Sequence, residues 1–296
     1  MGKSLDGKVA LVTGAGQGLG RAEALYLASE GAAVVVNDLG ASVEGEGRES
    51  KPAQAVVEEI KAAGGKAVAH GGDVSSYDDA KEMIDLAIKE FGDFHILINN
   101  AGILRDRMIF NITEGEWDAV VKVHLKGHFN TMRHACAYWR EQSKHSGQPA
   151  YGRVVNTSSE AFLMGSPGQP NYAAAKAGIV GLTTSTAQAM AKYGVTSNAI
   201  APRAATRMTE MFGMDKDEFA PENVAPLVGF LASPAAERIS GQVFIVWGSQ
   251  VSLLAPLRIE EKFETKGRWD YPRLADAMQP YFDKREPVTD GFIVKY

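Results

Sequence analysis

The chain has 296 residues, of which 45% are hydrophobic and 23% are charged, and its formal net charge is −5. This apolar fraction supports a large buried core and excludes a disordered chain. A mildly acidic chain without blocks of Lys or Arg is not expected to bind nucleic acid or a membrane surface. The single cysteine, Cys136, is typical of a reducing compartment, and the N-terminus resembles neither a signal peptide nor a membrane span. We therefore expect a cytoplasmic protein.

Short β-branched runs alternate with longer segments of helical periodicity, as in the βαβ units of a parallel sheet. Seven runs carry little charge, which is typical of strands covered on both faces. They span residues 8–13, 33–37, 66–70, 95–99, 153–158, 195–200 and 242–246. The helices expected between them span residues 19–30, 53–63, 76–90, 114–141, 172–193 and 222–232. The sequence predicts an α/β fold with a doubly wound, parallel, seven-stranded sheet of the Rossmann type.

Two segments depart from this alternation. Residues 40–52 are rich in Gly and polar side chains, which indicates a loop after the second strand. From residue 253 onward, prolines interrupt an aromatic-rich stretch that is too short and too broken for a second domain. We predict a single domain over residues 1–252, followed by a C-terminal extension over residues 253–296 that covers the substrate cleft or contacts a partner subunit.

A glycine motif, TGAGQGLG at residues 13–20, joins the first predicted strand to the first predicted helix. Glycines at these positions let the backbone turn sharply and approach a pyrophosphate at the helix N-terminus. Asp38 ends the second strand, 18 residues after Gly20. A carboxylate there accepts hydrogen bonds from the adenosine ribose and repels a 2′-phosphate, although Asp38 is also suited to cap a turn. The motif predicts a dinucleotide site that favours NAD over NADP.

Tyr172 and Lys176 are four residues apart, so they share one face of a predicted helix. A neighbouring ammonium lowers the pKa of a phenol from its usual value near 10 and makes the phenol a usable general acid or base. Tyr77 and Lys81 form a second such pair, which we interpret as a solvated surface pair. Tyr172 differs because Ser159 ends a predicted strand 13 residues earlier, at the sheet edge where such folds bind their ligands.

These motifs together resemble the short-chain dehydrogenase/reductase family over residues 5–252. The matching pieces are TGAGQGLG, NDLG, GGDV, NNAG, the triad Ser159, Tyr172 and Lys176, and NAIAP. The resemblance implies an NAD-dependent oxidoreductase that interconverts a secondary alcohol and a ketone. It implies that Tyr172 moves the hydroxyl proton, that Lys176 binds the nicotinamide ribose and tunes Tyr172, and that Ser159 holds the substrate oxygen. The implied cofactor-binding residues are Thr13, Gly14, Gln17, Gly18, Leu19, Gly20, Asp38, Asp73, Val74, Asn99, Ala101, Gly102, Tyr172, Lys176, Pro202 and Thr206.

Two positions depart from the family pattern. His124 stands in KVHLKG where most members carry an Asn that completes a catalytic tetrad and supports a proton-relay water through its bulged helix. The carbonyl of His124 is the candidate for this relay. Arg203 follows Pro202 where the family has Gly, which leaves Thr206 one residue short in register as the candidate to bind the nicotinamide amide.

Several segments are particularly similar to the (3R)-hydroxyacyl-CoA dehydrogenase domain of peroxisomal multifunctional enzyme type 2. They are NDLG, NNAGILRDR, VHLKG, GQPNYAAAK and IAPRAATRM. The likeness implies oxidation of a (3R)-hydroxyacyl-CoA to a 3-ketoacyl-CoA in the β-oxidation of fatty acids or sterol side chains. The alternatives are a 17β-hydroxysteroid or other alcohol dehydrogenase, a 3-oxoacyl reductase, and a non-catalytic NAD-binding regulatory protein. The arginines at positions 105, 107, 203 and 207 either meet phosphates of the substrate or pair with nearby carboxylates.

Three further sequence patterns concern metal binding, oligomerisation and a substrate lid. His124 and His128 have the spacing of half a zinc site, but other ligands are missing, so no metal is expected. The small residues of the predicted helix 172–193 suit either core packing or the interface of a homodimer or homotetramer. Residues 208–214, with three Met and one Phe, are interpreted as a substrate lid or as ordinary core.

Overall fold

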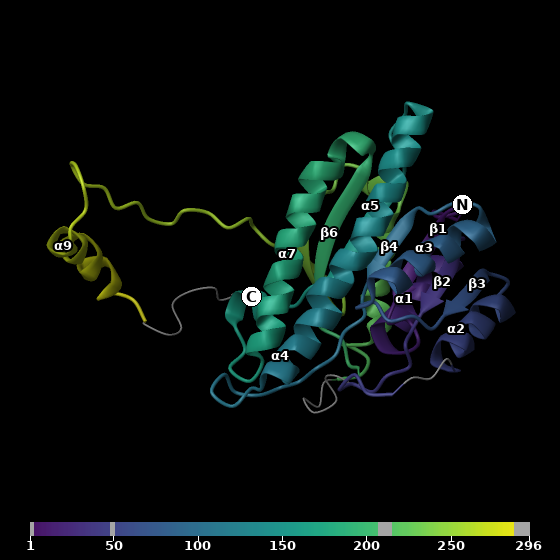
Figure 1. Cartoon of the computed structure of the whole chain (residues 1–296), viewed down its shortest axis with the longest axis horizontal. Coiled ribbons are helices and arrows are strands. Elements are labelled where there is room, and N and C mark those ends of the chain that lie inside the picture. The colour runs from purple at the N-terminus through teal and green to yellow at the C-terminus, as the bar shows by residue number, and fades with distance from the viewer. Residues whose placement is uncertain (1–2, 48–50, 207–214, 287–296) are drawn as a thin grey trace. The chain divides into compact units, whose positions relative to one another are not determined.

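The computed structural model describes residues 3–47, 51–206 and 215–286. The chain divides into two compact units, Met1–Leu253 and Leu254–Tyr296, and each is considered by itself. The first unit is built on one eight-stranded sheet with the strand order β3-β2-β1-β4-β5-β6-β7-β8 (Figure 1). The strands are β1 Val9–Thr13, β2 Ala33–Asn37, β3 Lys66–His70, β4 Ile96–Asn99, β5 Gly152–Thr157, β6 Val195–Pro202, β7 Val243–Trp247 and β8 Gln250–Leu253.

The doubly wound fold is confirmed, and all seven predicted strands are present and parallel. The predicted number of seven strands is one too few. Gly248 adopts φ 49° and turns the chain back, so that β8 pairs antiparallel with β7. This strand is short and lies at the sheet edge, where it lacks the continuous apolar run by which the other strands were found.

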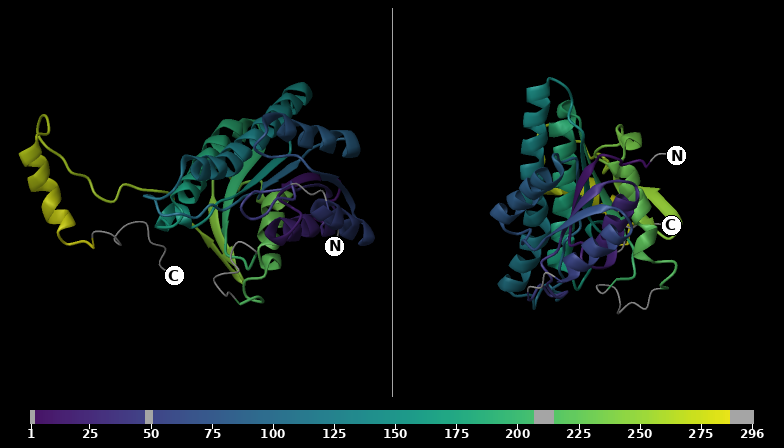
Figure 2. Two further views of the ribbon diagram at one scale, coloured as in Figure 1. Left: turned by 60° about the horizontal axis from the view of Figure 1, so that its bottom comes forward. Right: turned by 90° about the vertical axis from the view of Figure 1, so that its right-hand side faces the viewer.

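Helices cover both faces of the sheet, and each helical layer buries its own apolar cluster (Figure 2). The first layer consists of α1 Gly18–Ser29, α2 Lys51–Ala62 and α8 Ala225–Ala232. The second consists of α3 Tyr77–Phe91, α4 Glu114–Val121, α5 Gly127–Ser146 and α7 Pro170–Met190. A single turn, α6 Ala161–Met164, follows β5. Helix α7, which was predicted over residues 172–193, begins at Pro170, and proline suits the first turn of a helix.

The helix that periodicity predicted over residues 114–141 is interrupted at the position where the family resemblance implied a bulge. A π-helical turn, Lys122–Lys126, separates α4 from α5, and the Gly127 N–H donates to the carbonyl of Lys122 five residues back. Gly127 packs closely on Val74, because a Cβ at Gly127 would lie only 2.9 Å from Val74 Cγ2. This turn places His124 toward the sheet rather than toward solvent, with 1% of the residue exposed.

In its described residues, 254–286, the second unit contains one helix, α9 Tyr271–Phe282. Its N-cap Asp270 accepts a hydrogen bond from the Arg273 N–H at 3.0 Å. The ring of Tyr281 lies 5.5 Å from that of Phe263, and its hydroxyl bonds to Glu260 at 3.0 Å. Several large apolar side chains of this unit are exposed, including Leu257 at 76% and Ile259 at 84%. In the described ranges, none of the helices combines the length and the apolar character needed to cross a membrane.

Helix α1 buries one carboxylate, that of Glu23, which is 0% exposed. Within the described part of the chain neither of its side-chain oxygens has a hydrogen-bond partner. Removal from water disfavours the charged form, and burial raises the pKa of Glu23 from 4.5 to about 8. The folded protein therefore holds a proton on Glu23 at pH values where the unfolded chain has lost it.

This proton makes the stability of the fold depend on pH. Between pH 4.5 and about 8 the folded state binds more protons than the unfolded state, so the free energy of unfolding falls as pH rises. The contribution of Glu23 to this decline is on the order of 1.4 kcal/mol per pH unit. We expect Glu23→Gln to flatten the decline when chemical denaturation is measured from pH 5 to pH 8. The exposed Glu82→Gln variant serves as control, and equal slopes for Glu23→Gln and wild type would contradict the assignment.

Candidate active site

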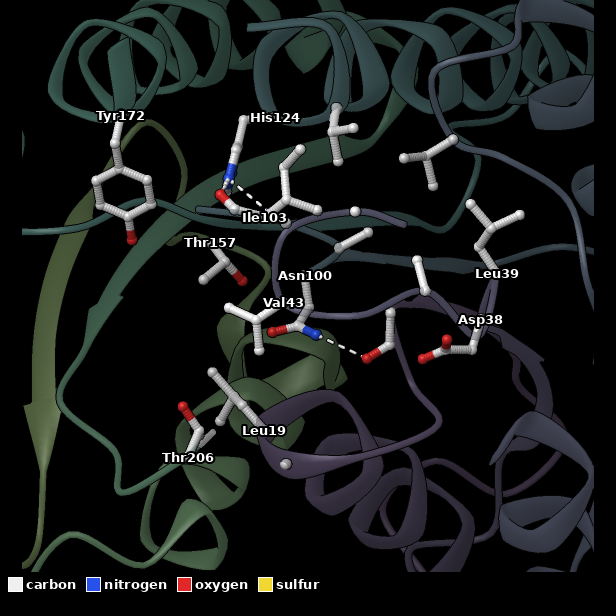
Figure 3. Close-up of a pocket in the computed structure, with 18 of the residues that line it drawn as sticks. Leu19, Asp38, Leu39, Val43, Asn100, Ile103, His124, Thr157, Tyr172 and Thr206 are labelled. Carbon is white, nitrogen blue, oxygen red and sulfur yellow. Dashed lines mark hydrogen bonds between the residues drawn. The ribbon is translucent and has the colours of Figure 1, made fainter. Parts of the chain in front are cut away.

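A cleft of about 600 Å³ opens at the carboxyl edge of the parallel strands (Figure 3). It lies where β1 and β4 are neighbours in the sheet, although the helices that follow them cover opposite faces. Such a switch point separates the connecting loops and leaves a crevice for a ligand. Most of the predicted site residues line this cleft. They are Gly14, Gln17, Gly18, Leu19, Asp38, Asp73, Val74, Ala101, Gly102, His124, Ser159, Tyr172, Lys176, Pro202 and Thr206.

The glycine motif forms one wall of the cleft. Gly14 and Gly18 adopt φ values of +63° and +53°, which favour glycine. A Cβ at Gly14 would lie 2.7 Å from the Cα of Ala101, so the two backbones meet only because this side chain is absent. Gln17 is the N-cap residue of helix α1, and its side chain makes no capping hydrogen bond within the described part of the chain. The N-terminus of α1 thus fits the pyrophosphate of a dinucleotide.

Three predicted cofactor residues lie behind the lining of the cleft and shape its wall. Thr13 accepts a hydrogen bond from the Asn100 N–H at 3.1 Å. A Cβ at Gly20 would lie 2.3 Å from the carbonyl oxygen of Gly14. Asn99 is 1% exposed, and its amide bonds to side chains of β5 and α5 at 2.9 and 2.7 Å. The neighbouring Asn100 lines the cleft instead and donates to the Gly14 carbonyl at 3.1 Å.

Asp38 stands at the opposite end of the cleft from Tyr172 (Figure 3). One carboxylate oxygen accepts the Gly16 N–H at 2.8 Å, and the other accepts the Gly40 N–H at 2.7 Å. The side chain therefore fixes both the glycine motif and the turn after β2, as the turn-capping alternative proposed. It also presents its negative charge to the cleft.

The loop after β2 is a part of the site that sequence reasoning missed. Residues 41–45 line the cleft, and Figure 3 places Val43 between Asn100 and Thr157. The carbonyl of Val43 accepts the Leu104 N–H at 3.0 Å. Glu46 pairs with Arg105 at 3.2 Å and ties the loop to the segment after β4. The several glycines of residues 40–47 were the available signal, but they indicated only a loop.

The predicted triad converges at the end of the cleft formed by β5 and α7. Lys176 is 2% exposed, and its Nζ donates to the Thr157 carbonyl at 2.6 Å. This amine lies 5.2 Å from the centre of the Tyr172 ring. Ser159, just after β5, hydrogen-bonds to Tyr172 and acts to lower its pKa. The structure thus brings together the three side chains that the sequence singled out.

Burial dominates the protonation of these groups. It raises the pKa of Tyr172, and the opposing hydrogen bond from Ser159 is the smaller effect. Burial also lowers the pKa of Lys176 from 10.5 to about 7. The expectation of a lowered Tyr172 pKa is wrong, because burial outweighs the opposing hydrogen bond. The ammonium form of Lys176 is itself disfavoured, and its amine bonds to the Thr157 carbonyl instead.

His124 packs beside the triad. Its ring meets the ring of Tyr172 edge-on, with centroids 5.3 Å apart, and its Nε2 lies 2.8 Å from the Ile103 carbonyl oxygen. Gly102 admits this ring, because a Cβ there would lie 2.3 Å from His124 Cε1. Burial and the nearby Lys176 hold the pKa of His124 well below its usual value. The carbonyl of His124 accepts the Gly127 N–H across the π-turn, and its role in a proton relay remains a prediction.

Three of the four arginines considered for phosphate binding pair with carboxylates. The pairs are Arg105 with Glu46, Arg107 with Glu116 and Arg203 with Glu160, at 3.2, 2.9 and 2.6 Å. The alternative of local ion pairs is therefore what the structure contains. Arg207 and the residues 208–214 considered as a lid lie outside the described residues. Within the described ranges, no group of three or more His, Cys, Asp or Glu is arranged to hold a metal ion.

Comparison with known proteins agrees with this geometry. The family model described as short chain dehydrogenase matches residues 8–218. The chain belongs to the short-chain dehydrogenase family. As a short-chain dehydrogenase it is an oxidoreductase, and members of this family typically use NAD or NADP. Its predicted membership is confirmed.

Similar short-chain dehydrogenases come from bacteria and fungi. The chain is 50% identical over 297 residues to the hydroxyacyl-CoA dehydrogenase ChsB1 of Mycobacterium tuberculosis, covering 96% of this chain and 91% of that protein. It is 50% identical over 252 residues to the peroxisomal hydratase-dehydrogenase-epimerase of Neurospora crassa, of which it spans only 27%. The crystal structure of a short chain dehydrogenase from Mycobacterium avium matches with a TM-score of 0.87 and 47% identity, over 98% of this chain and 100% of that one.

Proposed function

We propose that this short-chain dehydrogenase oxidises a (3R)-hydroxyacyl-CoA to a 3-ketoacyl-CoA with NAD, in the β-oxidation of fatty acids or sterol side chains. The observation that carries the proposal is the meeting of Ser159, Tyr172 and Lys176 in one cleft whose far end presents Asp38. The acyl-CoA substrate is supported by the likeness to ChsB1, most of whose length the chain covers.

The chain's own residues divide the chemistry between them. Ser159 donates a hydrogen bond to the substrate oxygen. Because burial keeps Tyr172 protonated, Tyr172 takes the hydroxyl proton as it gives up its own phenolic proton toward Lys176. Bound NAD supplies the acceptor for the hydride that leaves the carbinol carbon. Lys176, whose pKa of about 7 lets it gain and lose a proton near neutrality, holds the nicotinamide ribose and passes the proton onward. The carbonyl of His124 is the proposed support for the water of this relay.

The substrate is tested by NADH formation with (3R)- and (3S)-hydroxyacyl-CoAs of several chain lengths, 17β-hydroxysteroids and a control without substrate. We expect turnover of the 3R thioesters. Tyr172→Phe should reduce this turnover at least about a hundredfold, the lower end of what general acid–base catalysis contributes. NADH binding by this variant should persist. Turnover of steroid alcohols alone would favour the alternative dehydrogenase, and tight NAD binding without any turnover would favour the regulatory protein.

The choice of NAD rests on the charge of Asp38 at the end of β2. A 2′-phosphate on the adenosine ribose would face this carboxylate, and like charges brought together cost several kcal/mol. We expect Asp38→Asn to reduce the preference for NAD over NADP in kcat/KM at least about tenfold. This variant keeps one oxygen for the Gly16 or Gly40 N–H, whereas Asp38→Ala removes both acceptors. An unchanged preference in a folded Asp38→Asn protein would contradict the assignment.

We further propose that the protein acts in the cytoplasm as a homodimer or homotetramer. We also propose that residues 253–296 cover the substrate cleft or contact a partner subunit. The large apolar side chains Leu257, Ile259 and Tyr271 are exposed, and a ligand or a partner that covered them would remove this apolar surface from water. Deletion after Leu253 should raise the KM for the acyl-CoA while leaving the Kd for NADH unchanged. Size-exclusion chromatography with light scattering separates the two roles, and unchanged KM and oligomeric state would contradict both.

A further inference from the structure

A partly buried ion pair joins the ends of two strands beside the triad. Glu160 directly follows Ser159 after β5, and Arg203 directly follows Pro202 at the end of β6. Arg203 Nε donates to one carboxylate oxygen of Glu160 at 2.6 Å, and Nη2 donates to the other at 3.0 Å. The side chains are 9% and 28% exposed for Glu160 and Arg203. This two-pronged geometry fixes both the distance and the orientation of the two loops.

A third strand end takes part in the same contact. The guanidinium of Arg203 stacks on the ring of Trp247, the last residue of β7, at 4.4 Å from its centroid. The Arg203 N–H also donates to the Val246 carbonyl at 2.9 Å. Cation–π stacking stabilises a guanidinium that has lost part of its hydration. The side chain of Arg203 thus connects the carboxyl ends of β5, β6 and β7.

The backbone around Glu160 transmits this anchoring to the triad. The carbonyl of Glu160 accepts the Leu163 N–H at 2.9 Å and starts α6, while Ser159 Oγ accepts the Ala161 N–H at 3.2 Å. A shift of Glu160 relative to β6 would therefore move the Ser159 hydroxyl that bonds to Tyr172. On the β6 side, Thr206 lies three residues beyond Arg203 and lines the same cleft.

The pair belongs to one half of the cleft. Glu160 and Arg203 line it together with Ser159 and Thr206, whereas Asp38 lies at its other end. If the cleft holds NAD as proposed above, the adenosine is at Asp38 and the nicotinamide is at the ion pair. The two ends of the cleft are formed by different strands. Asp38 follows β2 and Glu160 follows β5, and β1 and β4 lie between these two strands in the sheet.

We infer that Glu160 and Arg203, stacked on Trp247, are positioning residues that hold Ser159 and Thr206 in register around the nicotinamide half of the cofactor. This inference rests on the proposed use of NAD. The pair sets nicotinamide affinity and turnover, and it leaves adenosine binding to Asp38 and the glycine motif. It also assigns Arg203 a structural task in place of phosphate binding, because its fork and its face are already engaged.

Two probes separate the halves of the cleft. NADH occupies both halves, whereas ADP-ribose lacks the nicotinamide. We expect Glu160→Gln and Arg203→Met to weaken NADH binding and to lower kcat by about tenfold to a hundredfold, since a misplacement of about 1 Å can cost on the order of a hundredfold in rate. The Kd for ADP-ribose, measured by titration calorimetry, should stay at the wild-type value in both variants.

The double variant Glu160→Gln/Arg203→Met guards against a trivial loss of folding, because it removes both charges of this pair together. We expect the double variant to melt at a higher temperature than either single variant. It should still bind NADH more weakly than wild type does, with an unchanged Kd for ADP-ribose. Arg203→Lys keeps the positive charge but lacks the planar guanidinium. Its NADH affinity and kcat should lie between those of wild type and Arg203→Met. Arg21→Met is the control, because Arg21 makes an exposed ion pair with Glu59, in which Nη2 donates to the two carboxylate oxygens at 2.7 and 2.8 Å. Arg21→Met should leave the Kd for NADH and the Kd for ADP-ribose unchanged.

The outcomes distinguish this inference from the proposed function. A wild-type protein that binds neither NADH nor ADP-ribose would overturn the use of NAD and the inference with it. A wild-type protein that binds both, with variants that lose both probes equally or lose neither, would overturn the positioning role alone. Selective loss of NADH affinity and of kcat, with ADP-ribose unaffected, is the result that supports it.

Discussion

The pairing of β1 with β4 is the constraint on which the site depends. Ala10 to Val12 face Ile96 to Ile98 in parallel register, so both strands end at the same edge of the sheet. The chain then leaves β1 toward one face through α1 and leaves β4 toward the other face through α4 and α5. The two connections cannot fill the space between them, and the cleft is that space. The glycine motif follows β1, Ser159 follows β5, and Tyr172 and Lys176 lie on α7, so the motif and the triad line the cleft from different elements.

Desolvation shapes the chemistry inside the cleft more than any charge pair does. The three titratable side chains at the reacting end, Tyr172, Lys176 and His124, are all shifted by burial toward their neutral forms. Each shift has the sign expected for a group removed from water. Burial therefore reduces the charge that these three side chains carry, and a hydrogen bond such as that from Lys176 to Thr157 is stronger there than it would be in water.

The sequence predicted the elements whose pattern is local. A strand covered on both faces is a continuous apolar run, so all seven parallel strands were found. Strand β8 was missed because Val251 and Leu253 are 54% and 60% exposed and no such run marks it. The π-turn at Lys122–Lys126 was implied only by the family resemblance, because the local apolar pattern of residues 114–141 does not mark it. Shifts in hydrogen-bond register leave the apolar period of a helix almost unchanged.

The candidate site was predictable in its residues but not in their surroundings. Spacing alone united Tyr172 with Lys176, because a helix fixes which residues share a face. Spacing did not show that Asn99 turns into the core while Asn100 meets the cleft, since both have the same side chain. The direction of the Tyr172 pKa shift also escaped prediction, because the burial of a phenol depends on the whole fold around it.

The reversal of the chain at Gly248 has a practical consequence. Strand β7 ends at the cleft edge, but β8 runs back along it until Leu253 stands opposite Phe244. The first unit therefore finishes at the edge that carries the amino ends of the parallel strands. Any label, affinity tag or fused protein attached after Leu253 would begin one strand length away from the cleft. The pairing of β8 would also keep the outer edge of β7 covered against association with other strands.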